Sequence, residues 1–147
     1  MWVVMTATMV REITATQACD LANVTYRQLD YWARKEWVSP SVDEGLGRAG
    51  RRLYSPADVV RLAALGHFGR AGLDVGRIGP ELAALDMPLG TDFLVAASSD
   101  GVRVCPAGRL RDEASQPALR VFFDTAPIQA RLRHAPVVSP TVTVRTA

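Results

Sequence analysis

The chain has 147 residues, 48% of them hydrophobic, which suits one globular domain with or without a small appendage and excludes disorder throughout. Its 17 Lys+Arg against 15 Asp+Glu leave a net charge of +2, so any attraction to a polyanion must come from a local patch of cations. Cys19 and Cys105 stand far apart with no clustered His or Cys, which suggests neither a zinc site nor a disulfide framework. The apolar opening, residues 1–10, is too short to span a bilayer and lacks the pattern of an export signal, so we expect a cytoplasmic protein.

Two helix starts stand close together near the beginning of the chain. Thr14 with Gln17, and Thr25 with Gln28, have the spacing of a capping box, in which the two side chains satisfy free backbone amides. Asn23, a residue type that tolerates positive φ, lies in the turn between them. A helix, a short turn and a second helix in this order predict a helix-turn-helix.

The second of these helices has two different faces. Leu29 and Trp32 point inward at helical spacing. The outward face carries Tyr26, Arg27, Asp30, Tyr31 and Arg34. Arg27 lies in the first turn, where recognition helices place side chains that enter a DNA groove.

A basic, glycine-rich loop follows. Residues 37–42 and 52–54 are expected to pair as two short strands, joined by the loop 45–51. Glycines let the backbone approach another molecule closely, and Arg48, Arg51 and Arg52 supply cations that suit phosphate oxygens. The loop therefore has the features of a wing.

Two more helices complete the first part of the chain. Ser55 followed by Pro56 begins one helix, and Asp74 caps the next, which Pro80 is expected to bend or restart. We place the first domain at residues 12–85 and the joint after it at 86–91.

The remaining residues change to β-type patterns. Residues 93–97 and 102–105 flank Asp100-Gly101 and predict a hairpin, residues 119–124 a third strand, and Pro127 the start of a short helix. This small α+β appendage, residues 91–135, is marginal by itself, so it should pack on the helical half or, as we prefer, on a second copy. Residues 136–147 suit a loose tail. The expected fold class is α+β: a winged helix-turn-helix of about four helices with a two-stranded wing, followed by this appendage.

Three short motifs carry a resemblance to a known family: Thr25–Trp32, Gly50–Ser55 and Ala71–Val75. In order and spacing they resemble the DNA-binding domain of the MerR family of bacterial regulators. The resemblance covers about residues 12–85. It implies that Arg27 is the arginine of the recognition helix, that Tyr31 reaches the phosphate backbone, and that Arg52 and Tyr54 belong to the wing.

The chain departs from the family pattern at two points. Asp30 stands where the family often has arginine; it could point away or select cytosine, but we expect an ion pair with Arg27 or Arg34. Nothing after Leu85 shows the sustained heptads of the long dimerisation helix. Dimerisation in the family's manner and activation by untwisting DNA therefore do not follow from the resemblance.

The hypothesis is a sequence-specific regulator of transcription that binds double-stranded DNA in the nucleoid, with the second helix in the major groove and the wing on the flanking backbone. The candidate contacts are Thr25, Tyr26, Arg27, Tyr31, Arg34, Arg48, Arg51, Arg52 and Tyr54. A homodimer is expected, and RNA polymerase or another protein is a further candidate partner.

Two alternatives stay open: an architectural DNA-binding protein of the excisionase type, and a protein-interaction adaptor built on a winged helix. No motif indicates a cofactor, a metal or a catalytic constellation, so we expect a protein that is not an enzyme. The sequence does not indicate the operator, the effector or whether transcription rises or falls.

Overall fold

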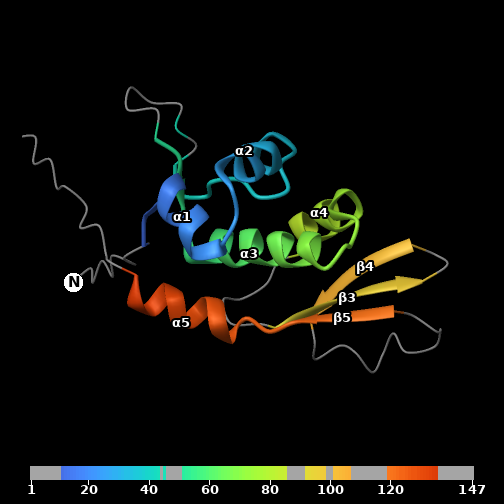
Figure 1. Cartoon of the computed structure of the whole chain (residues 1–147). Coiled ribbons are helices and arrows are strands. Elements are labelled where there is room, and N and C mark those ends of the chain that lie inside the picture. The colour runs from blue at the N-terminus through green and yellow to red at the C-terminus, as the bar shows by residue number, and fades with distance from the viewer. Residues whose placement is uncertain are drawn as a thin grey trace, which may run out of the picture.

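The computed structural model describes residues 11–43, 45, 51–85, 92–98, 101–106 and 119–135. The expected joint at 86–91, the expected tail at 136–147 and the wing tip with Arg48 lie outside these residues. Four helices, α1 to α4, form one half of the described chain, and a three-stranded sheet with helix α5 forms the other (Figure 1). The α+β class expected from the sequence is confirmed.

The helix-turn-helix forms as the two capping boxes predict. Helix α1 (Ala15–Ala22) begins at Thr14 and helix α2 (Tyr26–Arg34) begins at Thr25, and both boxes are complete. At the second box, the Thr25 amide donates to Gln28 Oε1 at 2.9 Å. Asn23 ends α1 in the left-handed conformation, with φ 54°.

Helix α3 (Pro56–Arg70) runs through the centre of the molecule. Most of its side chains are buried on several sides, so it has no polar face of the usual surface-helix kind. Its start at Ser55 carries a third capping box, formed with Asp58. Helix α4 (Val75–Ala84) is capped by Asp74 as expected and continues as one helix through Pro80.

The wing differs from the expectation in its strand pairing. Strand β2 (Leu53–Tyr54) pairs antiparallel with β1 (Ile13–Thr14), with Ile13 opposite Tyr54. The strand expected at residues 37–42 is wrong: among the described residues this arm meets β2 through the bridge between Asp43 and Leu53 and through the Val42 amide, which donates to the Leu53 carbonyl at 3.2 Å. Pro40 has no amide to donate, and the Ser41 amide is bonded to the Asp58 carboxylate, so neither can join a ladder.

The second half confirms the expected hairpin, third strand and helix. Strands β3 (Phe93–Ser98), β4 (Gly101–Pro106) and β5 (Leu119–Phe123) form an antiparallel sheet in the order β4-β3-β5. Ser98 is opposite Gly101 at the hairpin end, where Gly101 has φ 126°. Helix α5 (Ala126–His134) follows β5, with Pro127 in its first turn.

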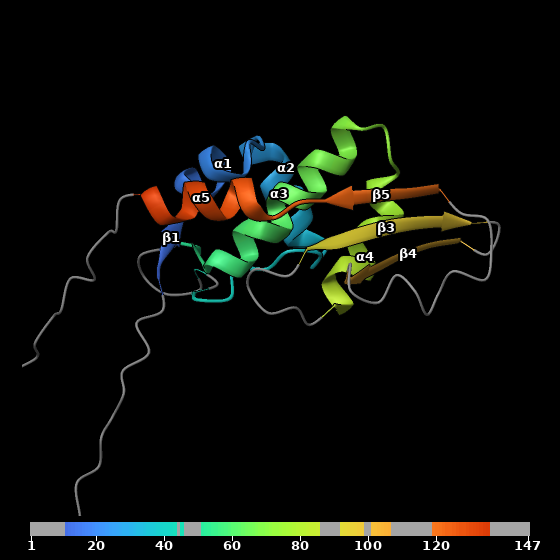
Figure 2. The same ribbon diagram turned by 90° about the horizontal axis from the view of Figure 1, so that it is seen from below.

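The two halves share one hydrophobic core. Helix α5 lies against α1 and α3, and β4 packs on α4 (Figures 1 and 2). Val95, Phe123 and Leu132 are buried in the same cluster as Leu29, Leu62 and other side chains of the helical half. Arg11 also donates to the carbonyls of Leu132 and Ala135 at the end of α5. Helix α2 lies on the side of α3 opposite α5 (Figure 1). No helix in the described ranges is long and apolar enough to cross a membrane.

Candidate nucleic-acid interface

Helix α2 presents its polar and aromatic side chains to solvent. Leu29 and Trp32 are buried, as expected, whereas Tyr26 is 60% exposed and Tyr31 is 50% exposed. Arg27 and Arg34 are also exposed. The cap at Thr25 and the inward pair therefore fix which face of α2 is available to a partner.

Tyr31 is held in place by its neighbours. Its ring stands edge-on to Trp37 with the centroids 5.9 Å apart, and Lys35 Nζ lies 5.8 Å from the Tyr31 centroid. These contacts orient the Tyr31 ring while leaving half of it exposed.

Asp30 joins α2 to the wing. Its carboxylate accepts a hydrogen bond from Arg52 Nη1 at 2.9 Å and forms an ion pair with Arg34 Nη2 at 2.8 Å. The hydrogen bond from Arg52 lowers the pKa of Asp30 and, in return, raises the pKa of Arg52. The expected ion pair is confirmed for Arg34 but not for Arg27. The contact with Arg52 could not be predicted from a local pattern, because Arg52 lies 22 positions from Asp30.

A hollow of about 540 Å³ lies between the starts of α1 and α2 and the segment Arg51–Arg52 that follows the wing loop. It is lined by Thr14, Ala15, Thr16, Tyr26, Arg51 and Arg52. Backbone amides at the start of a helix attract anions, and two guanidinium groups stand beside them. The arrangement suits a phosphate group. Thr14 to Thr16 were not among the candidate residues, although the capping box at Thr14 marks a helix start that could have pointed to them.

The structure brings three of the candidate side chains together and leaves three more exposed on α2. Tyr26, Arg51 and Arg52 line the hollow, and Arg27, Tyr31 and Arg34 are exposed on α2. Thr25 is exposed, but its hydroxyl is engaged in the capping box. Arg48 lies outside the described residues.

Tyr54 requires a correction, because it is not on the surface. Its side chain is 0% exposed beneath the wing, and its hydroxyl has no hydrogen-bond partner in the described structure. Burial raises the pKa of Tyr54 to about 12. Tyr54 is therefore a core residue that supports β2, and it cannot contact a duplex directly.

The comparison with protein families agrees with this geometry. The model of the MerR HTH family regulatory proteins matches residues 13–85, which span β1 to the end of the helical half. Residues 13–85 belong to the MerR family.

Two mycobacterial proteins are similar to part of this chain. An uncharacterized HTH-type transcriptional regulator of Mycobacterium tuberculosis (strain ATCC 25618 / H37Rv) is 41% identical over 61 residues, which are 42% of this chain and 27% of that protein. A protein of the same description from Mycobacterium bovis (strain ATCC BAA-935 / AF2122/97) gives the same values. The chain thus matches about a quarter of the length of these relatives.

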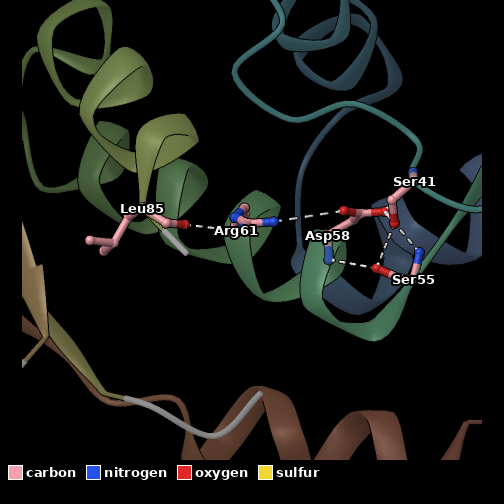
Figure 3. A network of polar contacts seen from close by, with 5 residues as sticks. All are labelled: Ser41, Ser55, Asp58, Arg61 and Leu85. Atoms are coloured by element: carbon pink, nitrogen blue, oxygen red, sulfur yellow. Dashed lines mark hydrogen bonds and ion pairs between the residues drawn. The ribbon is translucent and has the colours of Figure 1, made fainter. Parts of the chain in front are cut away.

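A buried polar network anchors the wing to the core of the MerR domain. Asp58, which is 3% exposed, accepts hydrogen bonds from the amide and hydroxyl of Ser41 and from the amide of Ser55 (Figure 3). Arg61 lies between this carboxylate, 4.0 Å from Nη1, and the carbonyl of Leu85, which accepts from Nη2 at 2.9 Å. The arm that leads from α2 into the wing is thereby tied to α3 and, through Arg61, to the end of α4.

The described part of the chain has no candidate metal site. Within these ranges, no group of three or more His, Cys, Asp or Glu residues is placed to hold a metal ion.

Proposed function

We propose that this chain binds double-stranded DNA as a regulator of transcription. In this proposal α2 enters the major groove with Arg27 reading base edges. Arg51 and Arg52 hold the flanking backbone, with a phosphate in the hollow beside the start of α1. Tyr26, Tyr31 and Arg34 complete the contact from α2.

The observation that carries the proposal is that the exposed side of α2 and the wing arginines form one surface. Tyr26 of α2 lines the same hollow as Arg51 and Arg52, and Asp30 bonds α2 to Arg52 directly. A single duplex can therefore meet both elements. The net charge of only +2 is no obstacle, because Arg27, Arg34, Arg51 and Arg52 supply local cations for a polyanion.

The mycobacterial relatives are described as HTH-type transcriptional regulators, which supports the regulatory part of the proposal. The family match covers residues 13–85, so it bears on DNA binding and not on what controls it. An architectural role and an adaptor role would use the same fold, and the following experiment distinguishes them.

Fluorescence anisotropy with a duplex selected from random sequence tests the proposal. Arg27→Ala should reduce the free energy of binding to the selected duplex by about 1–3 kcal/mol, because it removes a base contact. The loss on a scrambled duplex should be much smaller. Arg51→Ala should weaken binding to both duplexes similarly and make the affinity less dependent on salt, because it removes a phosphate contact.

Arg133→Ala is the matched control, since this exposed arginine lies on α5, across α3 from α2. Equal affinities for all three variants would overturn the assigned surface. Binding without selection of any sequence would favour the architectural role, and no salt-dependent binding at all would favour the adaptor.

A further inference from the structure

A groove of about 330 Å³ lies on the other side of the molecule from the proposed DNA surface, where the two halves of the chain meet. One wall comes from the end of α1 and from α3, and the other from the junction of β5 and α5. Helix α5 lies beside α1 and α3 in both views (Figures 1 and 2). Such a volume is at the lower end of the range for small-molecule sites, about 300–1,000 Å³.

The inner part of the groove is apolar and aromatic. Ala63 and Ile128 are 6% and 5% exposed, and Phe123 is 7% exposed. The ring of His67, exposed on α3, lies 5.5 Å from that of Phe123 at a tilt of 58°. A flat apolar group that enters the groove would contact these two rings.

The rim of the groove carries two arginines that come from different elements. Arg70 of α3 donates from Nη1 to the carbonyl of Asn23 at 2.9 Å, and Arg131 of α5 donates to the carbonyl of Leu21 at 3.3 Å. Both carbonyls are at the C-terminal end of α1, where the helix dipole is negative and favours cations. These bonds position the two guanidinium groups at one edge of the groove.

Both guanidinium groups have donors left for a ligand. Each arginine has five N–H groups, and the bond to the end of α1 uses one nitrogen of each. Neither forms an ion pair with a carboxylate in the described ranges. Arginine binds carboxylates in a planar, two-pronged geometry, so a carboxylate is the group that this rim suits.

We propose that the groove binds a small aromatic monocarboxylate, with its ring against Phe123 and His67 and its carboxylate between Arg70 and Arg131. Two cations exclude a cationic ligand, and inorganic phosphate alone would leave the apolar wall unused. Asp124 lines the same groove and accepts from the amide of Ala126 at 2.8 Å. Its negative charge disfavours a second carboxylate on the ligand. The site does not depend on the proposed DNA binding, because it uses none of the residues of that surface.

Isothermal titration calorimetry of the full chain with naphthoate tests the proposal. Naphthoate should bind saturably at one site per chain. The uncharged analogue naphthylmethanol should bind at least about tenfold more weakly, because it has no carboxylate for the two arginines to bind. Equal binding of the two compounds, or no saturable binding of naphthoate, would overturn the proposal.

Variants locate the site. Arg70→Gln and Arg131→Gln should each weaken naphthoate binding by about tenfold. Arg133→Gln makes the same change at an exposed position of α5 that does not line the groove, and it should shift the affinity by less than about twofold. Equal effects of Arg131→Gln and Arg133→Gln would place the binding elsewhere.

A gain in affinity separates a local effect from damage to the fold. Asp124→Asn keeps an acceptor for the Ala126 amide but removes the charge that repels the ligand. It should tighten naphthoate binding by about threefold, by removing a like charge near the carboxylate. Unchanged or weaker binding by this variant would contradict the assigned orientation of the ligand.

Discussion

Asp30 controls how much positive charge the proposed DNA surface presents. Its carboxylate is bonded to both Arg34 and Arg52, and it is 23% exposed. Because its pKa lies below the ordinary value of 3.8, it stays ionised across the neutral range. An acid at this position therefore offsets part of the charge of two arginines while orienting Arg52.

Asp30→Asn should increase affinity for scrambled duplex and reduce the preference for the selected one. The variant frees two cations toward phosphate, so the slope of log affinity against log salt should steepen by about 0.9 for each new phosphate contact. Glu81→Gln, the same charge change at an exposed position of α4, is the control. Weaker binding to scrambled duplex by Asp30→Asn would show that Asp30 is needed to hold the surface together.

Tyr54 gives the fold a measurable dependence on alkaline pH. Its pKa is raised from 10.0 to about 12 by burial, so the folded state favours the neutral phenol. The stability from this residue is therefore complete below about pH 10, and it is lost as the pH rises from 10 toward 12.

The free energy of unfolding should fall over this window in the unaltered chain and less steeply in Tyr54→Phe. At neutral pH the same variant should be neutral or more stable by up to about 1 kcal/mol, because the buried hydroxyl has no partner. Denaturant titrations at several pH values measure both effects. Identical pH profiles for the two proteins would contradict the assignment.

At the scale of the elements, the wing depends on contacts made by α3. The arm before the wing is not a strand, and its position is set by Ser41, which donates to Asp58 from both its amide and its hydroxyl. Asp58 also closes the capping box of α3. One carboxylate thus fixes the start of α3 and the base of the wing together (Figure 3).

Asp58→Ala should lower the free energy of unfolding by about 3 kcal/mol, because it leaves buried donors without a charged acceptor. Asp74→Ala, which removes an exposed cap of α4, should cost only about 1 kcal/mol. Urea denaturation followed by circular dichroism compares them. A similar, small loss for both variants would mean that Asp58 acts only as a helix cap.

For the molecule as a whole, the appendage is part of the core. Phe123 packs near Phe68, with ring centroids 5.8 Å apart, and Ile128 and Leu132 of α5 join the same cluster. We expected this region to pack on the helical half or, by preference, on a second copy, and the structure packs it on the helical half. The homodimer stays a prediction. Sedimentation equilibrium, which measures the molar mass in solution, tests it.

Phe123→Ala should destabilise both halves together, by about 3–5 kcal/mol. The unfolding transition seen by fluorescence of the three tryptophans, of which Trp32 and Trp37 lie in the helical half, should shift with that seen by circular dichroism. A fluorescence transition that stays in place while circular dichroism shows early loss of structure would indicate two independently folding units.

Local features could be read directly from the amino-acid sequence. Capping boxes at Thr14 and Thr25, the turn at Asn23 and the hairpin at Gly101 follow from bonds or φ preferences within a few positions, so they are readable without a fold. The resemblance to the MerR family follows from the same short patterns.

Features that join distant residues are visible only in the folded chain. Arg52 reaches Asp30, Asp58 reaches Ser41, and Arg131 reaches Leu21 across 22, 17 and 110 positions. The burial of Tyr54 and the pairing of β2 with β1 belong to the same group. Each depends on how helices and strands pack around α3, and that packing is a sum over many contacts that no short segment contains.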